Sequence, residues 1–323
     1  MLKRFFISIL ITIVILYILF TQISLKDLYI LLKSLDPFWA VLGTMGYFLA
    51  FLFRGLRYKW LIHSKNIPLS DLFRISILYN LSLMVLPSKL GELSYPYLLN
   101  KISGVSMTEG MASLIASRVY DFFIILMIFL FASVGFQDFF QINLFFIILL
   151  SAFLIGLTLL VFLYMSALLK LFANFMGRVS QWVGSKNSKS FQWVQRKIHE
   201  IAEDFYAIKA RRTYFSVTVT SLVSWIMVFW VFYAFLRGFG IKISFLKVVF
   251  GSTIAIIANA LPISGIGNWG TLELGWAAGF LLVGLSKEKA IATGFGVHIV
   301  AFVLCTIMAF FCWVTLKLHR RKQ

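Results

Sequence analysis

Four long runs without Asp, Glu, Lys or Arg constrain this sequence more than any other feature. They cover residues 5–25, 139–169, 213–236 and 290–316. A helix of about 20 apolar residues crosses the hydrocarbon core of a bilayer, so each run is long enough to span a membrane. Charged residues make up only 13% of the chain, too few to cover a water-facing surface. The sequence therefore predicts an all-α, polytopic membrane protein, and not a soluble enzyme.

The basic residues predict how the chain is oriented. The net charge is +18, but Lys and Arg gather at the ends of the runs and in two loops, as the positive-inside rule requires. This placement favours membrane lipids with anionic head groups as partners over nucleic acid. We expect a multi-pass protein of the cell (inner, cytoplasmic) membrane with both termini in the cytoplasm. Only the loop with Lys287 and Lys289, expected outside, departs from the rule.

The expected topology is a single transmembrane domain, 1–323, with six full crossings. An uncleaved N-terminal helix lies within 1–35, because no small-residue cleavage site follows its apolar stretch. A further helix covers 139–169. Residues 170–212 mix aromatic, basic and acidic residues and predict a cytoplasmic, basic, amphipathic connector. The second helix is expected at 37–53, followed by a basic loop.

Two further apolar segments are interrupted and too short to cross twice. Residues 69–101 break at Pro87, and residues 243–286 break at Pro262 and a glycine-rich stretch. We expect each to enter and leave on one side as a re-entrant helical hairpin, since broken backbone at membrane depth requires protein or a water-filled cavity around it.

The two hairpin regions match each other in order. Glu92 corresponds to Glu273, and Arg118 corresponds to His298 at the same spacing from a Gly-x-Ser. Repeat 1 covers 36–135 and repeat 2 covers 213–316, with opposite expected orientations. Inverted repeats with broken helices are typical of transporters, whose site lies at the repeat interface near the membrane midplane. The free N–H groups of the returning arms would favour an anionic group there.

Three segments carry a resemblance to a known family: LPSKLGELSYPYLL (86–99), GVSMTEGMASLIASRVYD (104–121) and LPISGIGNWGTLE (261–273), with RGLRYKW (54–60) as a looser match. At these residues the chain resembles the transmembrane region of lysylphosphatidylglycerol synthetases, a flippase-like membrane family. The resemblance implies a role in moving lipids between leaflets. Because the sequence stops at Gln323, we expect the aminoacyl-transferase activity of some family members to be absent.

The candidate substrate-binding residues are polar side chains within apolar segments, where an ionisable group predicts function. Arg118 could instead form a purely structural pair with Asp121, and Glu92 and Glu273 could cap broken helices or carry protons. For His298 and the asparagines, packing is the alternative. The set is Asn80, Lys89, Glu92, Arg118, Asp121, Asn259, Asn268, Glu273 and His298, with Arg54, Arg57 and Lys59 as contacts for head groups.

These patterns favour a lipid translocator for an anionic phospholipid or a polyprenyl-phosphate-linked lipid. A proton- or ion-coupled transporter of a small anionic solute is the alternative. The sequence offers no nucleophile–base pair, metal cluster or nucleotide-binding loop, so we expect no catalytic residues, cofactor or metal. We interpret the two cysteines, Cys305 and Cys312, as small apolar residues. A homo-oligomer, a partner membrane enzyme or a scaffold role remain open.

Overall fold

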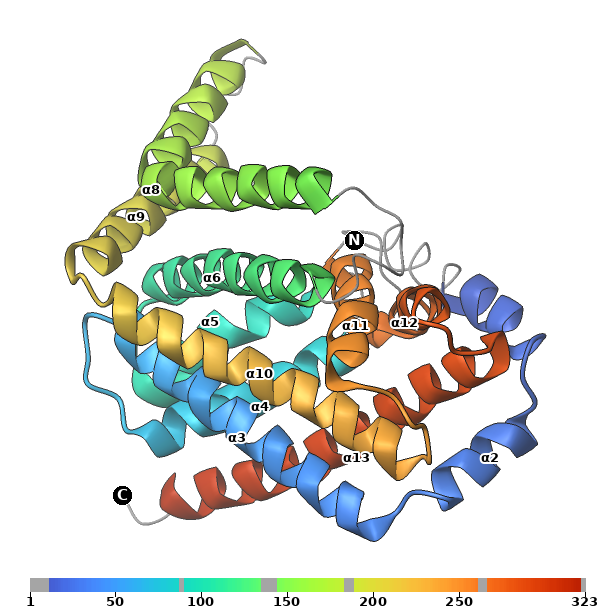
Figure 1. Ribbon diagram of the computed structural model, residues 1–323. Coiled ribbons are helices and arrows are strands. Elements are labelled where there is room, and N and C mark those ends of the chain that lie inside the picture. Colours follow the sequence, from blue (N-terminus) through green and yellow to red (C-terminus); the bar gives the residue numbers. More distant parts are fainter. Residues whose placement is uncertain (1–11, 87–89, 135–143, 183–188, 261–265, 321–323) are drawn as a thin grey trace.

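The computed structural model describes residues 12–86, 90–134, 144–182, 189–260 and 266–320, and every regular element in these ranges is a helix (Figure 1). Five helices are long and apolar enough to cross a membrane: Pro37–Leu61, Met107–Ser133, Ile148–Arg178, Tyr214–Gly238 and Lys287–Lys317. A bent pair of N-terminal helices would make a sixth span. The predicted fold class, an all-α polytopic membrane protein, is confirmed.

The N-terminal helix ends earlier than predicted. The helical segment Thr12–Phe20 is followed by α2 (Leu25–Lys33), and the two are bent by 82°. Ser24 and Asp27 cap the start of α2. The Ser24 hydroxyl accepts a hydrogen bond from the Asp27 amide (3.1 Å), and the Asp27 carboxylate accepts one from the Ser24 amide (3.3 Å). This reciprocal cap satisfies amides that would otherwise lack partners, and so starts a second helix.

Helices α3 (Pro37–Leu61) and α10 (Tyr214–Gly238) pack along each other at the centre of the fold. Glycines permit the close approach: a Cβ on Gly43 would meet the ring of Phe235 at 2.5 Å. The predicted loop with Arg54, Arg57 and Lys59 is wrong, because α3 continues through all three. Buried Tyr58 and Leu61 extend its apolar face to the helix end.

The first broken segment forms a hairpin followed by a long helix. Its elements are α4 (Leu69–Val85), the 3-10 turn η1 (Leu90–Leu93), α5 (Ser94–Ser103) and α6 (Met107–Val134). The hairpin starts and ends at the same end of α3, where the Lys65 ammonium donates to the Ser103 carbonyl (3.2 Å). Gly104, with φ +66°, closes α5 in the left-handed conformation that glycine favours.

The second broken segment repeats this order. Its elements are α11 (Phe245–Ala260), η2 (Ile266–Asn268), α12 (Thr271–Leu282) and α13 (Lys287–Arg320). Helices α11 and α12 touch through backbone, since a Cβ on Gly279 would lie 2.0 Å from the Gly251 carbonyl oxygen. This hairpin ends at the opposite end of the bundle, where Lys287 donates to Gln22 (2.6 Å).

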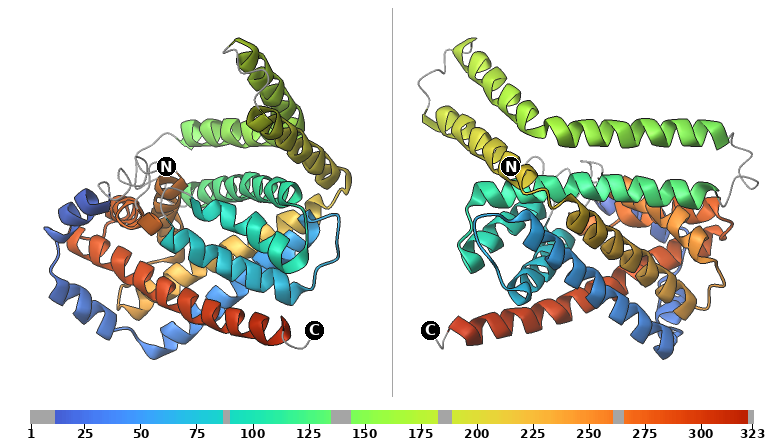
Figure 2. Two further views of the ribbon diagram at one scale, coloured as in Figure 1. Left: turned by 180° about the vertical axis from the view of Figure 1, so that it is seen from behind. Right: turned by 60° about the vertical axis from the view of Figure 1, so that its left-hand side comes forward.

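The two halves interlock. Helix α4 of the first half packs on α13 of the second, and α11 of the second packs on α6 of the first (Figure 2). The second break also touches the end of α4, where a Cβ on Gly267 would meet the Met84 carbonyl oxygen at 2.0 Å. Both breaks are therefore close to α4.

Helices α8 (Leu144–Trp182) and α9 (Lys189–Ala210) form an arm beside the bundle (Figures 1 and 2). Helix α8 continues past the expected boundary near residue 169 to Trp182, and its last part turns away from the direction of its first part (Figure 2). Helix α9 is amphipathic: Ala202, Phe205 and Ile208 are buried where it packs on α6 and α8.

Candidate functional site

Arg118 lies at the centre of a polar cluster formed by α4, η1 and α6. Its guanidinium is 2.6 Å from the Glu92 carboxylate and donates to the Tyr79 hydroxyl, also at 2.6 Å. The Tyr79 hydroxyl in turn donates to Glu92. Arg118 is eleven residues into α6, or about 16 Å along its axis at 1.5 Å per residue. The turn η1 thus brings a carboxylate to a cation near the middle of α6.

Asp121, one turn further along α6, connects this cluster to the central helices. Its carboxylate lies 2.5 Å from the Arg57 guanidinium on α3 and accepts from the Trp225 indole on α10 at 2.7 Å. A longer contact of 3.6 Å joins it to Arg118. One carboxylate therefore ties together α3, α6 and α10.

The two ion pairs differ in accessibility. The side chains of Arg57 and Asp121 are 2% and 9% exposed, whereas those of Arg118 and Glu92 are 41% and 27% exposed. A buried pair that also receives neutral hydrogen bonds fixes packing. An open pair can exchange its partner for a ligand. Arg118 and Glu92 are thus the part of the cluster able to receive a substrate.

A second pair occupies the other half of the fold. The His298 Nδ1 on α13 lies 2.5 Å from the Glu273 carboxylate at the start of α12, and the two side chains are 5% and 0% exposed. The second carboxylate oxygen accepts from the Gly270 amide (2.7 Å), so Glu273 also caps α12. The Trp269 ring stacks on the imidazole with 4.0 Å between centroids.

These two pairs occupy equivalent places. His298 is eleven residues after the start of α13, just as Arg118 is eleven residues after the start of α6. Each helix follows a left-handed glycine, Gly104 or Gly284. In each half the acid comes from the segment just after the break and the basic residue from the next long helix. The sequence match of Glu92 with Glu273 and of Arg118 with His298 thus has a counterpart in space.

The remaining predicted residues are dispersed. Asn80 donates to the Tyr47 hydroxyl (3.2 Å) and to the Cys305 sulfur (3.4 Å), linking α4 to α3 and α13. Asn259 is half-buried in the last turn of α11, and Asn268 has φ +65° in η2. Lys89 lies outside the described residues, as do both predicted breaking prolines, Pro87 and Pro262.

The predicted head-group contacts separate into three environments along α3. Arg57 is buried against Asp121, Arg54 is half-buried over the Phe51 ring with 5.0 Å from its Cζ to the centroid, and Lys59 is exposed. Of the three, Lys59 alone has the accessibility that contact with a head group from the bundle surface requires.

Sequence reasoning missed Tyr79 and Trp225, which complete the cluster. A tyrosine directly before Asn80, in an apolar helix, was a usable signal for Tyr79. Trp225 offered none, because an indole within an apolar run is usually a packing residue. Among the described residues, no group of three His, Cys, Asp or Glu side chains lies close enough to hold a metal ion.

Fold and site together define a polytopic helical membrane protein with paired charges inside its bundle. The family model of the lysylphosphatidylglycerol synthase transmembrane region matches residues 5–309, and the chain belongs to this family. The family associates the chain with membrane lipids, and its model describes a region separate from the catalytic transferase domain. Searches of curated proteins and of solved structures found no match.

Proposed function

We propose that this protein moves an anionic lipid between the two leaflets of the cell membrane, through a site between two re-entrant hairpins. The observation that carries the proposal is Arg118, a cation about 16 Å along a membrane-spanning helix with a 41% exposed side chain. A charge at this depth is costly and marks a substrate pathway by default.

The head group would bind by exchanging partners with Glu92. A phosphate oxygen accepts hydrogen bonds from guanidinium much as a carboxylate does, so it can replace Glu92 on Arg118. Tyr79 contacts both groups, and would hold Glu92 when Arg118 is occupied. The Arg57–Asp121 pair would keep α3, α6 and α10 in register during the exchange.

The proposed cycle uses the equivalence of the two halves. Hairpins that open toward opposite sides, as in inverted repeats, can expose one central site alternately to each leaflet. The contacts of α4 with α13 and of α6 with α11 are the surfaces along which the halves would rearrange.

One observation favours the second candidate, a proton-coupled transporter of a small anionic solute. Glu273 and His298 form a buried pair of groups that can both gain and lose protons. A proton carried by this pair could drive uptake of a solute bound at Arg118.

Proteoliposomes distinguish the two candidates. Phosphatidylglycerol and a polyprenyl-phosphate lipid with fluorescent head groups report translocation, while an entrapped anionic dye reports movement of a soluble solute. The proposal predicts that head groups of the anionic lipids cross and that the dye stays entrapped. Dye movement without lipid translocation would establish the second candidate instead.

A further inference from the structure

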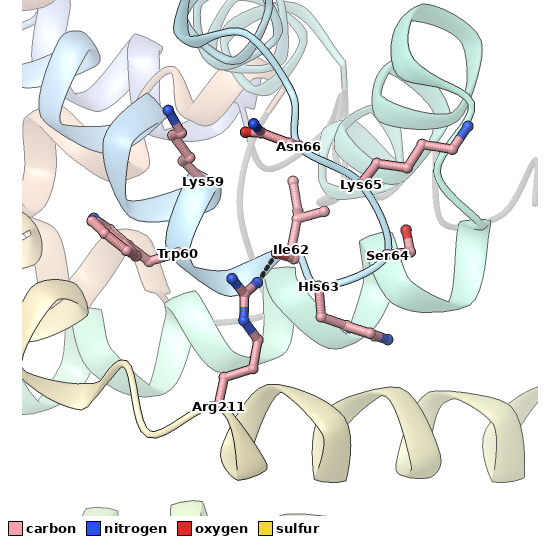
Figure 3. Close-up of a pocket in the computed structure, with 8 residues that line it drawn as sticks. All are labelled: Lys59, Trp60, Ile62, His63, Ser64, Lys65, Asn66 and Arg211. Carbon is pink, nitrogen blue, oxygen red and sulfur yellow. Dashed lines mark hydrogen bonds between the residues drawn. The ribbon is translucent and has the colours of Figure 1, made fainter.

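An open pocket of about 320 Å³ lies where α3 ends and α10 begins. Figure 3 shows its lining: side chains from the last turn of α3, from the loop that follows and from the turn after α9. The lining residues are Lys59, Trp60, Ile62, His63, Ser64, Lys65, Asn66 and Arg211. The candidate site at Arg118 does not use this pocket.

The pocket lies at the ends of two membrane spans. Helix α3 ends at Leu61 and α10 begins at Tyr214, and both are long and apolar enough to cross a membrane. The Thr213 hydroxyl donates to the Trp60 carbonyl (3.3 Å), which joins the two ends. Trp60, with 37% of its surface exposed, is the residue type enriched where membranes meet water.

Three cations line the pocket, and none of them forms a salt bridge with a carboxylate in the part of the chain that the structure describes. Lys65 donates to the Ser103 carbonyl (3.2 Å), and Arg211 donates to the Ile62 carbonyl. Lys59 is exposed. Carbonyl contacts leave the positive charges uncompensated and hold two of the three side chains in place.

The carboxylates of Glu109 and Asp204 lie next to the loop, and that of Glu109 accepts hydrogen bonds from the loop backbone. Glu109 is 2% exposed and accepts from the amides of His63 (2.6 Å) and Ser64 (2.9 Å). Asp204 on α9 lies 3.7 Å from the His63 imidazole. They contact the loop from the inside, so the charge of the pocket lining is that of Lys59, Lys65 and Arg211. Figure 3 shows the ammonium ends of Lys59 and Lys65 on opposite sides of this lining.

We propose that this pocket binds the phosphate of an anionic lipid head group from the adjoining leaflet. The cations supply the charge, Asn66 and Ser64 supply neutral hydrogen bonds, and the span ends place the phosphate at head-group depth. Because Glu109, in the first turn of α6, is about 14 Å along that helix from Arg118, the pocket is a separate site. The proposal holds whether or not the chain translocates lipid.

Native mass spectrometry of the full chain in detergent tests this site. Phosphatidylglycerol is titrated onto the wild type and onto the triple variant Lys59→Gln, Lys65→Gln, Arg211→Gln, with phosphatidylcholine as the uncharged comparison. The control variant Lys26→Gln, Lys33→Gln, Lys242→Gln removes the same charge from exposed positions outside the pocket. If the triple variant does not fold, the single variant Lys59→Gln, changed at an exposed position, is titrated in its place.

In the triple variant, the dissociation constant of the most tightly bound phosphatidylglycerol should be about tenfold higher than in the wild type. In Lys59→Gln it should be about threefold higher. Binding to the control variant and binding of phosphatidylcholine should not change. Equal retention of phosphatidylglycerol by the wild type and the pocket variants would overturn the proposal. Release of this lipid by millimolar inorganic phosphate would overturn the lipid source and assign the pocket to free phosphate.

Discussion

The Nδ1 of His298 lies 2.5 Å from the carboxylate of Glu273, at the position in the second half that Arg118 and Glu92 occupy in the first. Equivalent geometry thus carries different chemistry. The first pair has a permanent cation, because guanidinium keeps its proton at all physiological pH values. The second has an imidazole, which can change its charge. Under the proposed function, the half with the permanent cation is the half that holds the anion.

The buried pair of Arg57 and Asp121 should be important for stability. Arg57→Ala leaves the Asp121 charge buried without its main partner, which destabilises a protein by about 3–5 kcal/mol. The neutral double variant Arg57→Met, Asp121→Leu leaves no unpaired charge and should lose less. Thiol-reactive dye labelling of buried Cys305 and Cys312 on heating reports unfolding. The expectation fails if the single variant is as stable as the double variant.

The contact between α11 and α12 should not tolerate a side chain. In Gly279→Ala the new Cβ would lie 2.0 Å from the Gly251 carbonyl oxygen, a backbone atom that cannot move aside as a flexible side chain could. We expect a loss of about 1–3 kcal/mol in the free energy of unfolding, as for other overpacked contacts. Gly156→Ala on α8 is the matched control, because nothing lies within 4 Å of its Cβ position. Equal unfolding temperatures for the two variants would refute this packing.

The carboxyl of Asp204 should make the stability of α9 depend on pH. Helix α9 is not among the candidate membrane spans. Burial raises the pKa of its carboxyl above the ordinary value, while the Thr108 hydroxyl and the His63 charge act in the opposite direction. A raised pKa means that the folded state keeps this proton to higher pH than the unfolded state. The contribution of Asp204 to the free energy of unfolding therefore falls as pH rises from about 4 through the folded pKa.

Comparison with Asp204→Asn isolates that contribution. The wild type should lose stability relative to the variant as pH rises through this window, and the difference should then stay constant. Hydrogen exchange of the α9 amides, measured for both proteins from about pH 4 to 7, gives the difference. A difference that grows in favour of the wild type would show that His63 and Thr108 outweigh burial.

Much of the fold could be predicted from hydropathy, because a membrane span requires a long apolar run. Helices α10 and α13 follow their runs, 213–236 and 290–316, closely. Boundaries were predicted least well where a local contact decides them. The cap formed by Ser24 and Asp27 divides the N-terminal helix, and α3 continues to Leu61 because Arg57 finds a buried partner on α6.

The candidate site was predicted in part. Residue types and spacing gave Glu92, Arg118, Glu273 and His298, since ionisable groups are rare in apolar segments. The pairing of each acid with the next long helix depends on how the hairpin folds back, which spacing alone does not determine. The pairing of Asp121 with Arg57 needed a contact between residues 64 positions apart, and a positive-inside reading placed Arg57 in a loop instead.

The most direct test of the account is head-group translocation by Arg118→Gln in proteoliposomes. Arg74→Gln is the matched control, because Arg74 also forms an ion pair, with Asp71 at 2.8 Å, outside the polar cluster. We predict that translocation of phosphatidylglycerol falls at least about tenfold in Arg118→Gln and stays near the wild-type rate in Arg74→Gln, with both variants folded. Wild-type translocation by Arg118→Gln would contradict the claim that Arg118 receives the anionic head group.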